Sequence, residues 1–216
     1  MHARIRNQGI PMITPTTQQQ KHLQPQDEHI LVVKRNHLFP DAAWQGLQQV
    51  DFTNWLNIIQ ERKEFLPRSI METDSTYKQI IPYLVFEHQD SYFLMQRQAQ
   101  ASEKRLASKY SLGIGGHIRQ EDLGSSNIFD WAQREFHEEV DYKGDLAIEP
   151  LGILNDDSND VGKVHLGFVF LLKGDSAQIR VKSELKSGQL LSLEQCKQYA
   201  KQMETWSQLV FEFLLK

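Results

Sequence analysis

Three glutamates near the middle of the chain have the spacing that chemistry on one helix face requires. They are Glu135, Glu138 and Glu139. At about 100° per residue, their side chains fall within a fan about 100° wide. Like charges on one face repel each other and weaken a helix, and a bound hard cation is the simplest compensation. Because Mg²⁺ and Mn²⁺ prefer oxygen ligands and commonly act with substrate phosphates, the spacing indicates a metal site for a phosphate-containing substrate.

A glycine-rich turn precedes this helix, with Gly113, Gly115 and Gly116 followed by His117. Glycines allow tight turns and close backbone approach. A glycine cluster alone marks only a turn, so its occurrence together with the carboxylate helix is what indicates a site. His117 is a candidate for substrate contact, whereas His137 points away from the carboxylate fan and is expected at the surface.

Together the turn and the helix resemble the Nudix box. In words, that box is a Gly, five residues, a Glu, seven residues, then Arg-Glu-aliphatic-any-Glu-Glu-any-Gly-aliphatic. Gly116 supplies the glycine, and residues 134–139 match the functional half. Five residues after Gly116 the chain reaches Asp122, and about eleven residues then precede Arg134 instead of seven. Asp141 replaces the late Gly, and we expect it to take the helix-ending conformation that a Gly would take.

The resemblance implies an α+β fold, a Nudix-like α/β/α sandwich with a mixed central sheet, plus an N-terminal extension. It also implies a divalent-metal-dependent (di)phosphohydrolase that acts on acid anhydrides and cleaves the diphosphate linkage of a nucleoside diphosphate linked to another moiety. Its cofactor would be Mg²⁺ (or Mn²⁺), and its partner a small nucleotide-type substrate.

Site residues follow from the same resemblance. The metal ligands would be Glu135, Glu138, Glu139 and the Gly116 carbonyl. Glu135 acts as ligand or as base, and Arg134 orients a neighbouring carboxylate. A further Glu in a late loop contributes in many family members, and Glu184 is the candidate by position, with Glu149 and Glu194 as competitors. The candidates for substrate binding are Arg97, Arg105, Gly115, Gly116 and His117.

Two other functions compete with hydrolysis. The first is a catalytically silent nucleotide-binding or sensing module on the same fold, which the longer spacer and Asp141 favour. The second is isoprenoid diphosphate isomerisation, which uses a reactive Cys in the family. Cys196, the one cysteine of the chain, falls in the last predicted helix, and this argues against that chemistry.

Composition narrows the class of protein. The chain has 216 residues, 40% of them hydrophobic, and a formal charge of −4, which argues against nonspecific nucleic-acid binding. A single cysteine excludes an internal disulfide and favours a reducing compartment, so we expect a cytoplasmic protein. No apolar segment approaches the ~18 residues that cross a bilayer. A homodimer remains open.

Hydrophobic patterns divide the chain into a flexible leader (1–28), an accessory segment packed on the main domain (29–75) and the Nudix domain (76–216). Helices are predicted over 51–63 and over a continuous 192–216, with a short helix or loop over 41–50. Pro82 suggests an edge strand or bulge. We expect residues 155–162 to form a mobile loop near the substrate mouth. The predicted strands are 30–34, 79–87, 91–97, 146–154, 164–173 and 177–182, the last two pairing with each other.

Overall fold

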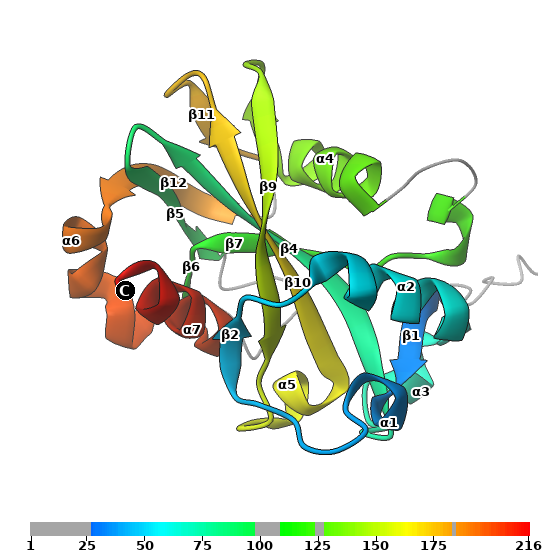
Figure 1. Cartoon of the computed structure of the whole chain (residues 1–216). Coiled ribbons are helices and arrows are strands. Elements are labelled where there is room, and N and C mark those ends of the chain that lie inside the picture. Colours follow the sequence, from blue (N-terminus) through cyan, green and yellow to red (C-terminus); the bar gives the residue numbers. More distant parts are fainter. Residues whose placement is uncertain (1–26, 98–108, 124–127, 183–184) are drawn as a thin grey trace, which may run out of the picture.

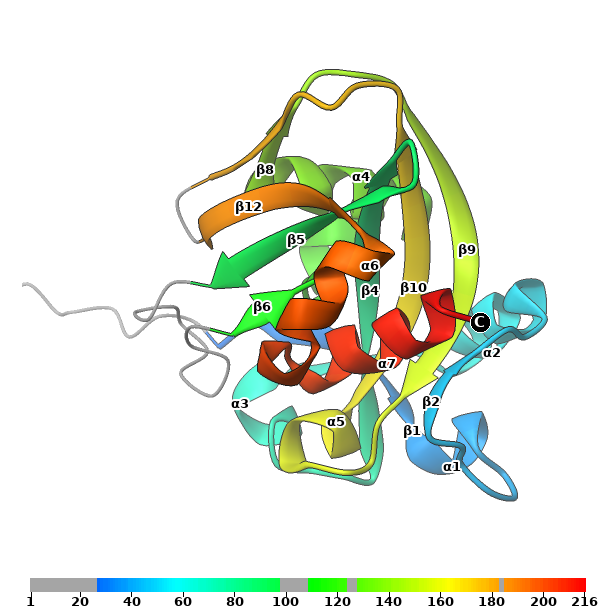
Figure 2. The same cartoon turned by 90° about the vertical axis from the view of Figure 1, so that its left-hand side faces the viewer.

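The computed structural model describes residues 27–97, 109–123, 128–182 and 185–216. Within them the strands form a ten-stranded mixed sheet and a separate two-stranded one (Figures 1 and 2). The main path of the large sheet runs β12 (Leu185–Ser192), β5 (Ser91–Arg97), β4 (Tyr77–His88), β10 (His165–Gly174), β9 (Leu146–Asn155), β2 (Gly46–Gln48). Further strands add to it, namely β1 (His29–Lys34), β3 (Glu64–Pro67), β6 (Tyr110–Ser111) and β7 (Gly113–Gly115). The small sheet pairs β8 (Val140–Tyr142) with β11 (Ile179–Val181).

The central pair, β4 and β10, is parallel, and the other neighbours along the main path are antiparallel. Both central strands are buried along most of their length, as expected for strands covered on two faces. Gln89 and Asp90 form the turn between β4 and β5 and both have positive φ, which two-residue hairpins of this kind require. The predicted hairpin is therefore present.

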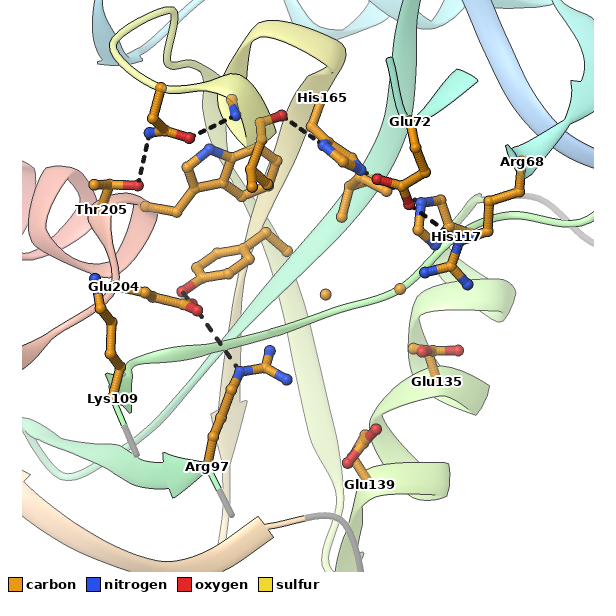
Figure 3. A pocket seen from close by; sticks show the side chains of 18 of the residues that line it. Arg68, Glu72, Arg97, Lys109, His117, Glu135, Glu139, His165, Glu204 and Thr205 are labelled. Atoms are coloured by element: carbon orange, nitrogen blue, oxygen red, sulfur yellow. Dashed lines mark hydrogen bonds and ion pairs between the residues drawn. The ribbon is translucent and has the colours of Figure 1, made fainter. Parts of the chain in front are cut away.

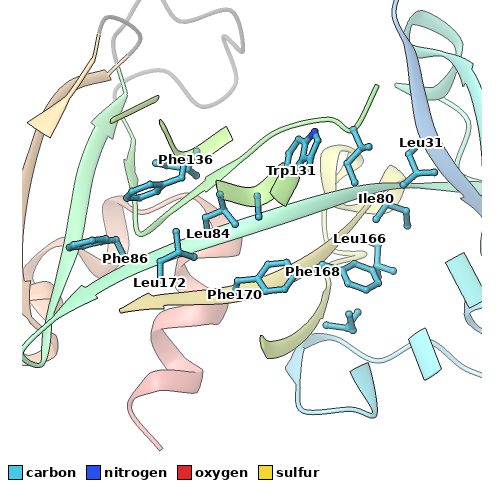
Figure 4. Close-up of a cluster of buried hydrophobic side chains, with 14 of the residues drawn as sticks. Leu31, Ile80, Leu84, Phe86, Trp131, Phe136, Leu166, Phe168, Phe170 and Leu172 are labelled. Atoms are coloured by element: carbon cyan, nitrogen blue, oxygen red, sulfur yellow. The ribbon is translucent and has the colours of Figure 1, made fainter. Parts of the chain in front are cut away.

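Helices cover both faces of the sheet. On β10, Phe168 and Phe170 lie in the hydrophobic cluster drawn in Figure 4. Their rings contact those of Phe52 in α2 (Phe52–Arg62) and Phe129 in α4 (Ile128–Glu139). Val169, the residue between them, belongs to the opposite core beneath α7 (Thr205–Leu214). This period-two alternation places a hydrophobic layer on each face. The predicted α/β/α sandwich with a mixed central sheet is confirmed.

The segment 29–75 contributes directly to the sheet. β1 pairs with β4, and β2 pairs with β9. Its helices are α1 (Arg35–Leu38), α2 and α3 (Arg68–Met71). The Asp51 side chain caps α2 by accepting from the Asn54 amide, and Trp55 and Ile59 are its buried face, as the apolar stripe predicted. The segment thus forms one wall of the fold around β4.

Several predicted elements were wrong. Residues 41–50 contain the short strand β2 and no helix. Pro82 lies inside the central strand β4. On one side of β4, pairing with β1 ends at Gln79 and pairing with β7 begins at Tyr83, so Pro82 lies between the two ladders, where its missing N–H costs no hydrogen bond. The strand at 179–181 pairs with β8 and not with β10.

Asp141 does not end α4 in a left-handed conformation. It lies in the extended strand β8, opposite Arg180 of β11, directly after the helix. The chain therefore leaves the helix as a strand, and a Gly is not required there. Beyond Asp141, the tip at Gly144 lies so close to Asp175 and Tyr142 that a Cβ would overlap them.

The acidic segment 155–162, expected to be a mobile loop, makes hydrogen bonds to the rest of the fold and leads into a short helix. Asp157 receives two hydrogen bonds from Arg35, at 2.9 and 2.6 Å, and one from buried Lys78 at 3.0 Å. Asp156 is fully buried, and Asn159 caps α5 (Asp160–Val164). The partner cations hold the pKa of Asp157 well below its usual range. Asp157 therefore ties the segment to α1 and β4.

The region after β12 is not one helix. It consists of α6 (Leu193–Cys196), a 3₁₀ segment η3 (Lys197–Gln202) and α7. The predicted capping box of Ser192 and Gln195 is present at the start of α6. The break before α7 places Glu204 at its N-cap position. In the described part of the chain, no helix is long and apolar enough to cross a membrane.

Candidate active site

A cleft of about 650 Å³ opens between α4, the N-terminal end of α7 and the segment around α3 (Figure 3). Its described lining carries seven carboxylates and four cationic side chains. The carboxylates are Glu28, Glu72, Glu135, Glu138, Glu139, Asp160 and Glu204, and the cations are Arg68, Arg97, Lys109 and Arg119. This excess of negative charge disfavours a bare anionic substrate and favours a bound cation.

Helix α4 forms the acidic wall because its apolar stripe faces the core. Trp131, Ala132 and Phe136 are buried, and the Phe136 ring stacks on Phe86 at 5.8 Å (Figure 4). The opposite side of the helix is thereby turned to the cleft. The structure thus places Glu135, Glu138 and Glu139 together in the lining, as their spacing predicted.

Glu135 is partly buried. Burial, and then the charges of Glu138 and Glu139, raise its pKa from 4.5 to about 7. Glu138 is 58% exposed and lies 3.6 Å from Arg134. Three carboxylates thus lie close enough on α4 for Glu138 and Glu139 to raise the pKa of Glu135.

Gly116 lies against Glu135. A Cβ at position 116 would overlap the Glu135 carboxylate, so only glycine allows this approach. The contact brings the backbone of the glycine turn and the carboxylate of α4 to the same point of the cleft. A site built from a glycine backbone and a Glu side chain was predicted, and the two are neighbours.

Arg134 is held by a residue from the long spacer. Its guanidinium lies 2.9 Å from Asp122 Oδ1. Asp122 Oδ2 also accepts from the Arg119 amide at 2.8 Å and from the Trp131 indole at 3.2 Å. Asp122 thus links the spacer to α4. One of its oxygens contacts Arg134 and the other is held by Arg119 and Trp131, so Arg134 is fixed beside Glu138.

The donors on α4 fit a hard divalent cation. They are carboxylate oxygens, with a backbone cradle at Gly116 that a Cβ would fill. Among the described residues, the three carboxylates do not gather their oxygens within 4.8 Å of one another, whereas Glu72, His117 and His165 do. A shared ion on α4 would therefore require side-chain rotation, which the exposure of Glu138 permits.

Glu204 forms a second acidic point opposite α4. It is 5% exposed and accepts hydrogen bonds from Tyr83 at 2.9 Å and from Ser111 at 2.7 Å. Arg97 Nε lies 3.7 Å from its other oxygen (Figure 3). Ser207 contributes a longer bond at 3.2 Å. This carboxylate is held by hydrogen bonds from its neighbours.

Sequence reasoning missed Glu204. The apolar residues on both sides of it continue one helical pattern from 192 to 216, so the break at 203–204 was not visible. A signal was present in Thr205 and Ser207, because Ser and Thr are common where helices begin. The competing candidates lie elsewhere: Glu149 pairs with Lys173, and Glu194 pairs with Lys197, both away from the cleft.

Other predicted site residues divide into two groups. Arg97, Gly115 and His117 line the cleft. Glu184 and Arg105 lie outside the described residues. Cys196 is buried in α6, and burial raises the pKa of its thiol to about 11, so it is no nucleophile. His137 is exposed, as its angle on the helix predicted.

Comparison with known proteins gives close relatives. The chain is 35% identical to Protein YmaB of Bacillus subtilis (strain 168) over 202 residues, which cover 87% of this chain and 98% of YmaB. It superposes on the crystal structure of Tm1382, a candidate Nudix hydrolase, with a TM-score of 0.71 and 32% identity, covering 87% of this chain and 98% of Tm1382. No family model matches the chain.

More distant structures share the fold. The Nudix domain of Shewanella oneidensis NrtR, solved with ADP ribose, covers 64% of this chain with a TM-score of 0.51 and 12% identity, and 86% of that domain is matched. DR0079 from Deinococcus radiodurans also has a TM-score of 0.51, at 14% identity, over 64% of this chain and 83% of DR0079. These two likenesses concern the fold alone.

Proposed function

The chain belongs to the Nudix superfamily, and from this premise we propose that it is a divalent-metal-dependent hydrolase. Its substrate would be a nucleoside diphosphate linked to another moiety, cleaved at the diphosphate. The observation that carries the proposal is the group of three carboxylates on α4, turned into the cleft beside Gly116. The likeness to a candidate Nudix hydrolase over nearly the whole of both chains supports it.

The residues divide the work by charge. Glu135, Glu138 and Glu139 would hold Mg²⁺ or Mn²⁺, with the Gly116 carbonyl nearby. A bound ion of this kind neutralises phosphate oxygens and makes a coordinated water more acidic. Arg97 and Lys109 line the cleft beside Glu204 and would receive the remaining negative charge of the diphosphate (Figure 3).

Two carboxylates are candidates for taking the proton of the attacking water. Glu135 has a pKa near 7, which suits a general base at neutral pH. Glu204 is oriented by Tyr83 and Ser111 and needs no rearrangement to accept a proton. Of the two, we assign the role of general base to Glu204, because Glu135 lies against Gly116 within the group that would hold the ion.

A substrate screen tests the hydrolase. Purified chain with Mg²⁺ or Mn²⁺ is mixed with ADP-ribose, dinucleoside polyphosphates, nucleotide sugars, coenzyme A and oxidised nucleotides, and released phosphate or nucleotide is measured. We expect turnover of at least one compound, lost in Glu138→Gln and kept in Glu121→Gln. Glu121 is a matched control because it is exposed and outside the cleft.

The alternative, a nucleotide-sensing module, gives a different result in the same experiment. Calorimetry would then detect tight nucleotide binding, without product in the presence of either metal. Turnover unaffected by Glu138→Gln would instead place the chemistry away from α4. Retention of all three carboxylates on α4 favours the hydrolase over the sensor.

A further inference from the structure

A second group of metal-binding side chains lies at another end of the cleft. Glu72 follows α3, His117 follows β7, and His165 begins β10. One potential ligand atom from each lies within 4.8 Å of the others. Figure 3 shows the three side chains converging beside Arg68, apart from Glu135 and Glu139 on α4. Three separate elements therefore bring two imidazoles and one carboxylate to one point.

Hydrogen bonds orient His165 as metal-bound histidines are oriented. Its Nδ1 lies 2.7 Å from the Val161 carbonyl, which can only accept, so Nδ1 carries the proton. Its Nε2 then has a lone pair, and this atom lies 3.4 Å from Nε2 of His117. A ligating imidazole held through its other nitrogen by a backbone carbonyl is the usual arrangement in metal sites.

The other two members also have defined partners. His117 Nε2 donates to Gln79 Oε1 at 2.7 Å, and the Gln79 amide donates to the Met71 carbonyl at 3.1 Å. A metal ion on this nitrogen would therefore replace the hydrogen bond to Gln79. One oxygen of Glu72 accepts from Arg68 at 3.2 Å, and Arg68 is shared with Glu28. These contacts hold each side chain in place around the common point.

The nitrogen separation suits a metal. With metal–nitrogen bonds of about 2.1 Å, two nitrogens 3.4 Å apart subtend about 108° at the ion. That angle is close to tetrahedral, the geometry that Zn²⁺ prefers. When His117 coordinates through Nε2, its proton must be on Nδ1, so the imidazole ring remains neutral.

We propose that Glu72, His117 and His165 form a second metal site, which binds a transition-metal dication of the Zn²⁺ type. Two imidazoles and one carboxylate are ligands that Zn²⁺, Co²⁺ and Fe²⁺ accept and that Mg²⁺ disfavours. The all-oxygen group on α4 has the opposite preference. The site stands independently of the proposed hydrolysis. It would also join the segment around α3 to β10, so metal binding stabilises the fold.

Metal titration of the full chain tests the proposal. Chelator-treated protein is titrated with Co²⁺, whose visible absorption reports nitrogen ligation, and with Zn²⁺ in competition with a chromophoric chelator. The variants are Glu72→Gln, His117→Gln and His165→Ala. We expect one Zn²⁺ per chain in the wild type, an increase of Tm on binding, and at least about tenfold weaker binding in each variant.

Two matched controls separate this site from other sources of binding. His137→Gln removes an exposed histidine, and Glu138→Gln alters α4; both should keep the Co²⁺ spectrum and the Zn²⁺ affinity. Circular dichroism checks that each variant is folded, and Glu72→Gln, at a partly exposed position, preserves a test if His165→Ala does not fold. Wild-type binding no tighter than that of Glu72→Gln, or binding lost in Glu138→Gln, would overturn the proposal.

Discussion

The carboxylates on the two sides of the cleft, those of α4 and that of Glu204, have different surroundings. On α4, three glutamates share one face, and their repulsion and burial raise the pKa of Glu135 to about 7. At the N-cap of α7, Glu204 is nearly inaccessible but accepts hydrogen bonds from three hydroxyls and lies near Arg97. The protein therefore stabilises Glu204 with its own side chains, whereas we propose that a cation stabilises the carboxylates of α4.

The largest expected effect comes from removing the charge of Glu135. Glu135→Gln keeps the shape of the α4 wall and deletes the carboxylate that lies against Gly116. We expect kcat/KM for the best substrate of the screen to fall about 10²–10⁴-fold, with the fold intact by circular dichroism. Glu121→Gln serves as the exposed control. Activity within a factor of two of wild type would show that the α4 wall is not where the ion acts.

Gly116→Ala tests whether the backbone cradle matters to that wall. The added Cβ overlaps the Glu135 carboxylate and displaces it, so we expect an activity loss of about a hundredfold. At Gly115 a Cβ would only meet Ile81 and Tyr83 at 3.1 and 3.3 Å, and Gly115→Ala is the milder neighbour for comparison. Equal losses in the two variants would contradict a specific role for the Gly116–Glu135 contact.

Removing a hydrogen bond to Glu204 should lower the stability of the protein. Tyr83→Phe removes a donor to Glu204 within a buried network, and we expect the free energy of unfolding to fall by about 1–3 kcal/mol in urea. Tyr92→Phe, on the neighbouring strand and partly exposed, is the control. An unchanged midpoint would mean that Glu204 does not depend on its hydroxyl partners.

The pH dependence of stability distinguishes the walls without any substrate. The folded state raises the pKa of Glu135 from 4.5 to about 7 and so holds a proton that the unfolded chain releases. In metal-free buffer this contribution is fully present below pH ~4.5 and is lost as the pH rises through ~7. We expect the difference in unfolding free energy between wild type and Glu135→Gln to shift against wild type over that range. Saturating Mg²⁺ should restore it, and a pH-independent difference would contradict the assigned cause.

Much of this site could be predicted from sequence because it is local. The α4 carboxylates, Arg134 and Gly116 lie within 24 residues of one another, and helical periodicity fixes which of them share a face. Asp141 was misread because the pattern of the box was expected to hold where the chain passes directly into β8. Local rules describe a helix end well only when the next element is known.

The remaining residues could not be predicted because long-range pairing brings them together. Glu204 meets Tyr83 from 121 positions away, and Glu72, His117 and His165 meet only after β10 has paired with β4. At the break before α7, Met203 forms a backbone bridge with Tyr110 and packs in the same core cluster as Cys196 of α6, within an otherwise continuous apolar pattern. Short-range sequence patterns therefore do not predict these contacts.

The central claim is that α4, and not the opposite wall, is completed by a hard cation. Calorimetric titration of chelator-treated protein with Mg²⁺ measures this directly, because Mg²⁺ disfavours the nitrogen ligands of the site proposed at Glu72, His117 and His165. We predict binding in the wild type and in Glu204→Gln, and none in a variant with Glu135, Glu138 and Glu139 all changed to Gln. Equal Mg²⁺ affinity in that triple variant and the wild type would contradict the account.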